Sequence, residues 1–202
     1  DLMQLHNPEK KILKNLDLLK PLMKEKKKGK IRAFGLSLKN PLDFFQIKNL
    51  DLVDSIQVNL NILDTRAIEL GIEKQCKRNN IKLISRTPFS FGFLTGKINA
   101  NNYFPKNDHR SLWSNDQKEK WISYSKKLYE SNLLSKKLSQ AQLCLGFCMS
   151  VPDVSLTIAG MMSEKEVIEN SDVLGMSPFN ERQIQYIIKF NKDNESFINS
   201  DC

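Results

Sequence analysis

The chain has 202 residues, 40% of them hydrophobic and 27% charged, which suits one globular domain with a buried core. No segment approaches the ~18 consecutive apolar residues that a membrane helix needs, and the first ten residues lack the basic start and apolar centre of a signal peptide. The net charge is +8, and much of it lies in the run KEKKKGK at 24–30. Because no aromatic residues interleave with these lysines, the run indicates a solvated helix end rather than a nucleic-acid surface.

Short apolar runs alternate with helical patterns along the chain. The apolar runs predict strands, in chain order, at 1–5, 31–36, 52–58, 81–85 and 154–158. The helical patterns predict helices at about 17–28, 41–47, 66–78, 117–137, 139–150, 164–170 and 180–191. This order is typical of parallel βαβ units, whose strands are buried on both faces.

Two architectures fit such units, an open doubly wound sheet and a (β/α)8 barrel. A doubly wound nucleotide-binding fold is expected to carry a glycine-rich turn, and the sequence contains neither GxGxxG nor GxxxxGK[ST]. The sequence therefore predicts an α/β fold, a parallel (β/α)8 TIM barrel. Such a barrel needs eight strands and ~250 residues, so we expect the chain to supply only part of it. Residues 1–202 are assigned to one domain, with a core at about 1–191 and a polar tail at 192–202.

The cysteines and histidines give little sign of a metal site. Cys76, Cys144, Cys148 and Cys202 form no CxxC pair and lie far in sequence from both histidines. They indicate buried thiols in a cytosolic protein. We therefore expect a cytoplasmic location and no bound metal.

Polar residues follow the apolar runs. Sites in these barrels form where strands end and βα loops begin. The residues at these positions are His6–Asn7–Pro8, Ser37–Leu38, Gln57 with Asn59 and Asn61, Arg86–Thr87–Pro88, and Gly160–Met161–Met162. The sequence therefore places a candidate ligand site at the carboxyl ends of the strands.

Five segments around these positions resemble the aldo-keto reductases in order and spacing. QLHNP at 4–8 resembles that family's fourth strand, GKIRAFGLS at 29–37 its fifth, and IQVNLNILDTR at 56–66 its sixth. LISRTPFSFGFLTGK at 83–97 resembles the seventh strand and its long loop, and VPDVSLTIAGMMSEKEVIEN at 151–170 the eighth strand and the cofactor helix. The resemblance implies that the chain supplies about strands 4 to 8 and begins within the fold, at an Asp rather than a Met.

The resemblance also implies an oxidoreductase that transfers a hydride between NADP(H) and a carbonyl or alcohol substrate. The family works with Asp, Tyr, Lys and His. The His matches His6, which would orient the carbonyl, and the other three are expected upstream of Asp1. A lone histidine is more often structural, but its place at a strand end inside a family motif favours the catalytic role. The 202 residues by themselves are expected to be inactive.

The resemblance assigns the nicotinamide contacts to residues after neighbouring strands. Ser37 and Gln57 match residues that bond the carboxamide, whereas Leu38 replaces a frequent family Asn. Arg86 matches a position that stacks on the nicotinamide ring. Its other possible role is a bond to a phosphate or to a substrate carboxylate.

The phosphate and adenosine contacts are implied for two further segments. The backbone of residues 87–91, which includes Thr87 and Phe89, is expected to follow the pyrophosphate. The 2′-phosphate and adenosine are expected at the helix start, where the matching residues are Gly160, Ser163, Glu166, Glu169 and Asn170. Because Glu166 stands where the family has Arg or Gln, NAD(H) stays open beside NADP(H). Without the family, EKEVIEN is simply the polar start of a surface helix.

The remaining aromatic residues and apolar stripes have ordinary interpretations. His109, in the long loop, fits a lid over the site or a surface position. Trp113 and Trp121 are expected to pack rather than to bind substrate, and the stripes Leu18/Leu19/Leu22 and Ile184/Ile187/Ile188 are expected in the core.

Two functions share this fold, and the partners differ little between them. The first is an aldo-keto reductase-like enzyme acting on a small carbonyl or alcohol. The alternative is a non-catalytic dinucleotide-binding sensor or regulatory protein of the same fold. Neither needs a nucleic acid or a membrane, and a catalytic Tyr and Lys upstream of Asp1 would distinguish the enzyme from the sensor.

Overall fold

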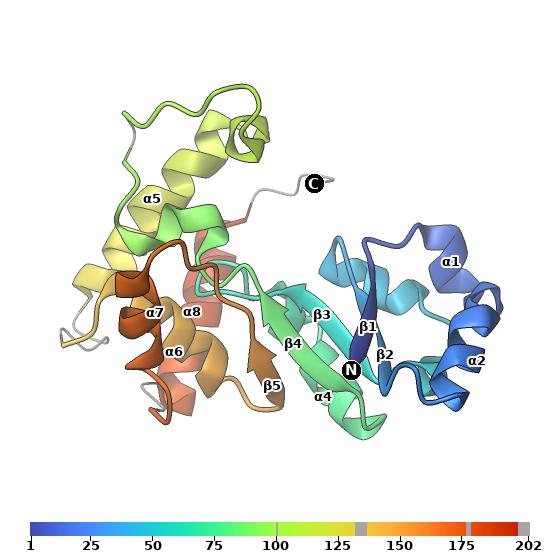
Figure 1. Cartoon of the computed structure of the whole chain (residues 1–202). Coiled ribbons are helices and arrows are strands. Elements are labelled where there is room, and N and C mark those ends of the chain that lie inside the picture. Colours follow the sequence, from blue (N-terminus) through green and yellow to red (C-terminus); the bar gives the residue numbers. More distant parts are fainter. Residues whose placement is uncertain (100, 132–136, 177–178, 198–202) are drawn as a thin grey trace.

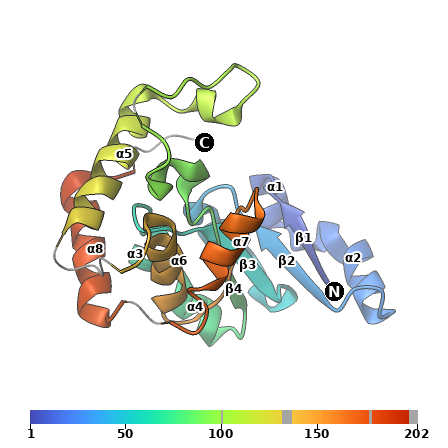
Figure 2. The ribbon, with the colours of Figure 1, turned by 60° about the vertical axis from the view of Figure 1, so that its left-hand side comes forward.

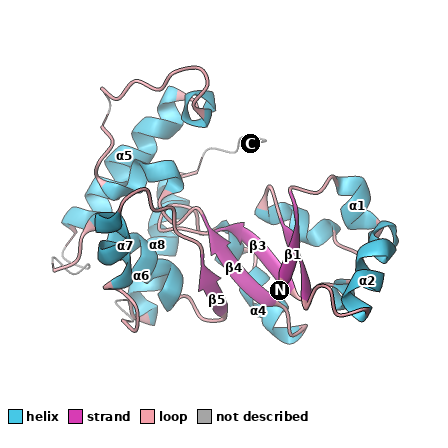
Figure 3. Ribbon diagram, in the orientation of Figure 1, coloured by secondary structure: helices cyan, strands magenta, loops and turns pink. Residues whose placement is uncertain are grey.

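A computed structural model describes residues 1–99, 101–131, 137–176 and 179–197. Its centre is a parallel sheet in the order β1-β2-β3-β4-β5, so the strands lie side by side in chain order (Figures 1 and 3). The strands are β1 (Leu2–His6), β2 (Ala33–Ser37), β3 (Ser55–Asn59), β4 (Lys82–Arg86) and β5 (Val154–Thr157). The predicted parallel βαβ organisation is confirmed.

Helices connect these strands. The α-helices are α1 (Lys10–Lys14), α2 (Lys20–Lys27), α3 (Arg66–Glu69), α4 (Ile72–Arg78), α5 (Asn115–Glu130), α6 (Gln140–Ser150), α7 (Glu164–Ser171) and α8 (Glu181–Asn194). Short 3-10 helices are η1 (Leu16–Leu19), η2 (Pro41–Gln46), η3 (Leu50–Leu52), η4 (Ser90–Thr95) and η5 (His109–Leu112). Among the described residues, none of these helices has the length and apolarity needed to span a bilayer.

The two faces of the sheet differ in polarity. Successive side chains of a strand alternate between its faces. One face carries the fully buried Phe34, Leu36 and Ile56, which pack with Leu13 of α1 and Ile72 of α4. This apolar face is the reason that the central strands are buried under helices.

Near the middle of β2, the opposite face of the sheet carries a glycine and polar side chains in place of large apolar ones. A Cβ on Gly35 would lie 2.9 Å from the Ser55 carbonyl oxygen and 3.3 Å from Cγ of Gln4. Residues Gln4, Gly35 and Ser55 therefore share this face on three neighbouring strands. Because the approach is so close, only glycine fits at position 35 without displacing β3.

A second apolar cluster lies on the β5 side of the sheet, where α5, α6 and α8 gather (Figures 1 and 2). Its members include the fully buried Trp121 and Phe147 together with Ile187 of α8. The rings of Trp121 and Phe93 lie 5.3 Å apart, and those of Trp113 and Trp121 lie 4.8 Å apart. The predicted packing role of both tryptophans is confirmed.

The sequence predicted strands that are buried on both faces, but the two edge strands are partly exposed. On β1, Leu2 and Met3 are each 41% exposed; on β5, Leu156 is 55% exposed, and Ile158 just after it is 45% exposed. The linear strand order leaves β1 and β5 as the two edges of the sheet. Apolar side chains at both edges are thus open to solvent.

Several predicted helices differ in extent from the observed ones. The segment expected at 17–28 begins as η1, so Leu18 is 55% exposed rather than in the core. The segment expected at 66–78 divides into α3 and α4 at Gly71, whose φ of 68° is left-handed. The helix expected at 117–137 is α5, and the part of that prediction at 132–136 lies outside the described residues.

The last helix reaches further than the core boundary predicted at 191. Asn191 donates its amide to the Ile62 carbonyl at 3.0 Å and to Thr65 Oγ1 at 3.2 Å, which anchors the end of α8. Ser196 is 1% exposed, and its carbonyl accepts a hydrogen bond from Gln117. Ser196 and Phe197 therefore pack against the rest of the domain, although Lys192, Asp193 and Glu195 are exposed, and 198–202 lie outside the described residues.

Candidate functional site

Three predicted site residues form a single row across neighbouring strands. His6 pairs in register with Ser37, and Ser37 pairs in register with Gln57. Paired residues of a parallel sheet point to the same face, and each lies two positions beyond the polar set Gln4, Gly35 and Ser55. The row is therefore at the carboxyl end of the sheet, on its polar face.

The members of this row differ in their contacts. Gln57 Nε2 donates to Ser37 Oγ at 3.2 Å, and Ser37 is 2% exposed. His6 is exposed on the edge strand β1. His6 is thus open to solvent at the end of the row.

Arg86 ends β4 on the same face of the sheet, one step beyond the row, and pairs in register with Asn59 rather than with Gln57. Its Nη2 donates to the Leu38 carbonyl at 2.7 Å, which joins β4 to the loop after β2. Burial lowers the pKa of this guanidinium, and its buried Nε has no partner among the described residues. Arg86, for which ring stacking or an anion contact was predicted, thus already links the ends of two strands.

The loop after β4 has an unusual backbone. Thr87, Ser90 and Phe91 have positive φ values of 55°, 43° and 58°, in the region that disfavours non-glycine residues. Two asparagines hold the loop: Thr87 Oγ1 donates to Asn59 Oδ1 at 3.1 Å, and Asn61 Nδ2 donates to the Thr87 carbonyl at 3.1 Å. Such constrained backbone is often found at ligand sites.

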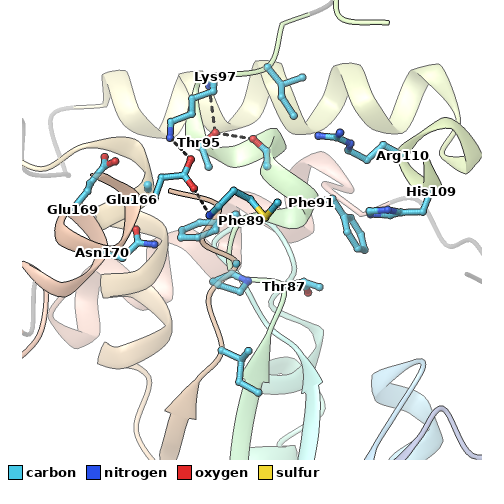
Figure 4. Close-up of a pocket in the computed structure, with 17 residues that line it drawn as sticks. Thr87, Phe89, Phe91, Thr95, Lys97, His109, Arg110, Glu166, Glu169 and Asn170 are labelled. Carbon is cyan, nitrogen blue, oxygen red and sulfur yellow. Dashed lines mark hydrogen bonds and ion pairs between the residues drawn. The ribbon is translucent and has the colours of Figure 1, made fainter. Parts of the chain in front are cut away.

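This loop forms the floor of a cavity of about 620 Å³. Figure 4 shows Glu166, Glu169 and Asn170 on one side, His109 and Arg110 on the other, and Thr87 and Phe89 between them. The full lining is Thr87, Pro88, Phe89, Phe91, Gly92, Thr95, Lys97, Ile98, His109, Arg110, Ala141, Ile158, Gly160, Met162, Glu166, Glu169 and Asn170. The volume and the mixed polar and apolar lining suit an organic ligand.

The helix side of the cavity is built on the start of α7. Ser163 caps the helix as predicted, because its Oγ accepts the Glu166 N–H at 3.3 Å. Glu166 Oε1 accepts the Lys97 ammonium at 2.8 Å, and its Oε2 accepts the Met162 N–H at 2.8 Å. Lys97 first, and then this N–H, lower the pKa of Glu166, and Glu166 raises the pKa of Lys97.

The loop side of the cavity is aromatic and basic. The His109 ring lies 4.8 Å from the Phe91 ring in an edge-on arrangement. Arg110 pairs with Asp108, and this pairing lowers the pKa of Asp108 to about 2. His109 lines the cavity, and its role in a lid stays a prediction.

The predicted site residues fall into two groups. The cavity holds Thr87, Phe89, Gly160, Glu166, Glu169 and Asn170. Ser163 lies outside it, beside an adjoining hollow that also touches Glu166 and Glu169. The row on the sheet holds His6, Ser37 and Gln57, and Arg86 lies just beyond it at the end of β4, so all the predicted residues lie at the carboxyl ends of the strands or in the segments that follow them.

Sequence reasoning missed Lys97, Thr95 and Arg110 as lining residues. Lys97 ends the segment FLTGK, which was compared with the family only as a loop. It lies 69 positions from Glu166, so no local pattern reveals the pair. Only the fold of the long loop shows that this lysine faces the cavity.

Burial makes the described cysteine thiols unreactive. Cys76, Cys144 and Cys148 are buried free thiols, and burial raises the pKa of Cys76 and of Cys148 to about 12. Cys202 lies outside the described residues. Within the described ranges no cluster of three or more His, Cys, Asp or Glu side chains is placed to hold a metal ion.

Comparison with known proteins identifies the family. The model of the Aldo/keto reductase family matches residues 1–192. The chain belongs to the aldo/keto reductase family. It is 29% identical over 150 residues to the aldo-keto reductase yakc [NADP(+)] of Schizosaccharomyces pombe, covering 72% of this chain and 44% of that protein. It is 26% identical over 181 residues to the chloroplastic pyridoxal reductase of Arabidopsis thaliana, covering 86% and 47%.

Solved aldo-keto reductases share the fold. The glycerol dehydrogenase from Gluconobacter oxydans superposes with a TM-score of 0.74 at 23% identity, covering 100% of this chain and 61% of that one. A holo aldo-keto reductase from Bacillus halodurans gives 0.65 at 23% identity, covering 94% and 60%. The chain thus spans less than half of the curated relatives, and its five parallel strands confirm the prediction of a partial TIM barrel.

Proposed function

We propose that the protein carrying this aldo/keto reductase chain transfers a hydride between NADP(H) and the carbonyl or alcohol group of a small molecule. The observation that carries the proposal is the in-register row of His6, Ser37 and Gln57 beside the cavity after β4. Ligands of parallel α/β folds bind at the carboxyl ends of the strands. At that edge the row would hold the reacting groups, and the cavity would hold the rest of the dinucleotide.

The residues present fit a dinucleotide along this edge. Asn170 is 8% exposed and lines the cavity. The strained loop at 87–91 brings backbone close to the groove, where phosphates bind in other proteins. The yeast relative carries NADP(+) in its name, and a Klebsiella pneumoniae aldo-keto reductase of similar fold was solved with NADP and acetate. These observations support NADP(H) as the cofactor.

The chain's own residues have distinct roles in this proposal. Ser37 and Gln57 would hold the nicotinamide carboxamide, because an amide and a hydroxyl supply both a donor and an acceptor. His6 would donate to the substrate oxygen and orient it. Bound NADP(H) supplies or accepts the hydride.

We further propose that the active unit closes this sheet with additional β/α units. The exposed apolar residues at the β1 and β5 edges support closure, since an unpaired edge is a liability in a folded protein. The proton-donating Tyr and its Lys and Asp partners are expected in those units. The 202-residue chain by itself is therefore expected to reduce no carbonyl.

The proposal is tested with the full-length protein. Addition of NADPH should change its intrinsic tryptophan fluorescence, and a panel of aldehydes and ketones should show NADPH oxidation with at least one member. Binding of NADPH without turnover of any substrate would support the dinucleotide-binding sensor instead. Absence of both binding and turnover would reject the proposal.

The compartment is also part of the proposal. Three free buried thiols agree with a reducing compartment, and we propose the cytoplasm. A fluorescent fusion of the full-length protein, imaged in its native cell, would show diffuse cytoplasmic signal, and an organellar pattern would contradict this assignment.

A further inference from the structure

The loop after β4 turns at a residue whose type disfavours such a turn. Thr87 has a φ of 55°, in the left-handed region that β-branched residues rarely adopt. The next residue is Pro88, and a residue before proline is normally extended. The local sequence therefore disfavours the conformation that places Thr87, Pro88 and Phe89 on the cavity (Figure 4). Contacts from elsewhere in the fold have to hold it.

The Thr87 carbonyl is the group through which the fold holds this turn. Because Pro88 has no N–H, that carbonyl is the only hydrogen-bonding group of the peptide unit between the two residues. Its oxygen accepts the Ser90 N–H at 2.9 Å and the Asn61 Nδ2 at 3.1 Å. The first bond closes the turn locally. The second comes from a residue 26 positions earlier, so it fixes the turn relative to the rest of the fold.

Asn61 is held rigidly enough to serve as an anchor. It lies just after β3 and is 2% exposed. Its Oδ1 accepts the Leu63 N–H at 2.9 Å, and its backbone exchanges two hydrogen bonds of 3.1 Å with the backbone of Asp64. These contacts fix both the backbone and the side chain of Asn61. Its bond to Thr87 therefore ties the loop after β4 to the loop after β3.

The anchor acts on the cavity through Thr87 and not by direct contact. Among the described residues, the cavity lining includes Thr87, Pro88 and Phe89 but not Asn61. A ligand on this floor meets backbone that is already in place, so less conformational entropy is lost on binding. Loss of the anchor would leave the turn free to relax toward the extended conformation that its sequence favours.

We propose that Asn61 is a positioning residue for the dinucleotide, which holds the peptide between Thr87 and Pro88 in its strained conformation and so pre-organises the floor of the groove. The inference rests on the proposed function. It makes dinucleotide affinity depend on the Asn61 N–H donor. Hydride transfer depends instead on His6, Ser37 and Gln57, which lie on β1, β2 and β3. Turnover at saturating NADPH should therefore change less than about threefold when the donor is lost.

The test compares NADP+ dissociation constants of the full-length protein and its variants, measured by fluorescence titration from neutral to mildly acidic pH. Asn61→Asp keeps the size of the side chain and the acceptor for the Leu63 N–H, but it replaces the donor with a carboxylate. At neutral pH we expect binding to weaken about tenfold. Burial favours the protonated form of a carboxyl group, which can donate to Thr87 again. The loss relative to the wild-type protein should therefore shrink as pH falls.

Two further variants separate positioning from stability. Asn191→Asp is the matched control, because Asn191 is also buried and its Nδ2 donates to the Ile62 carbonyl and to Thr65. It should lower the urea midpoint about as much as Asn61→Asp does, but it should change NADP+ affinity less than about twofold. Asn61→Ser removes the donor with a shorter, uncharged side chain. It should weaken binding about fivefold at every pH, and it replaces Asn61→Asp if that variant folds poorly.

A measurement on the wild-type protein covers the case in which neither Asn61 variant folds. The Ser90 amide should be protected from hydrogen exchange before NADP+ is added, because its bond to Thr87 is already formed. Protection that arises only in the complex overturns the inference. So does unchanged affinity in Asn61→Asp and Asn61→Ser, or an equal loss of affinity in Asn191→Asp. Failure of the wild-type protein to bind any dinucleotide overturns the proposed function and the inference with it.

Discussion

The Gln57 amide lies 3.2 Å from the Ser37 hydroxyl, and this bond joins β2 and β3 at the row that ends in His6. The two residues lie on adjacent strands in direct register, so each fixes the orientation of the other. A ligand that reaches the row meets a paired amide and hydroxyl rather than two mobile side chains.

Gln57→Leu is predicted to weaken NADPH binding by the full-length protein about fivefold to tenfold, because one hydrogen bond contributes ~1 kcal/mol. Fluorescence titration measures the change. Gln4→Leu is the matched control, since Gln4 lies on the same face of β1 and its buried Nε2 has no partner among the described residues. Equal losses in both variants would show that the effect is general to this face of the sheet.

His6→Ala is predicted to lower the carbonyl turnover of the full-length enzyme by about a hundredfold or more while changing NADPH affinity little. The reason is that His6 would contact the substrate oxygen rather than the dinucleotide. Steady-state kcat and the NADPH dissociation constant are the two readouts. His6→Gln retains a donor and should recover part of kcat, whereas parallel losses of turnover and affinity would argue against the orienting role.

Gly35→Ala is predicted to destabilise the fold by about 1–3 kcal/mol, because the new methyl group meets the Ser55 carbonyl at 2.9 Å. Gly160→Ala, whose methyl group would meet no atom within 4 Å, should cost less than about 0.5 kcal/mol. Urea denaturation followed by circular dichroism compares the two. A similar midpoint for both variants would contradict the close approach of β2 and β3.

Glu73→Gln is predicted to stabilise the protein at neutral pH. Glu73 is 4% exposed, one of its oxygens has no partner within the described residues, and burial raises its pKa above 4.5. The folded state thus favours the protonated form, so the carboxyl group's contribution to stability is present below the unfolded pKa and is lost as pH rises through the folded one. The urea midpoints of the wild-type protein and of Glu73→Gln should differ at neutral pH and converge below about pH 4.5. A difference between the two midpoints that does not change with pH would contradict the raised pKa.

Several features followed from local pattern. The strands of the central sheet and the Ser163 cap of α7 depend on neighbours within a few residues, so the sequence predicts them well, and the alternation of strands with helices indicates their parallel order. Leu18 and the helix at 66–78 were predicted less well. In the first case η1 turns the leucine outward, and in the second Gly71 interrupts the helix, although its apolar period continues.

The sequence by itself determined that the chain is α/β, that polar residues end its strands, and that its segments resemble the aldo-keto reductases. Those properties follow from the hydrophobic periodicity and from short sequence motifs. Only the tertiary structure decided that His6, Ser37 and Gln57 share one row and that Lys97 pairs with Glu166 across 69 positions. The physical reason is that strand register and loop path are set by packing between distant segments, which no local pattern encodes.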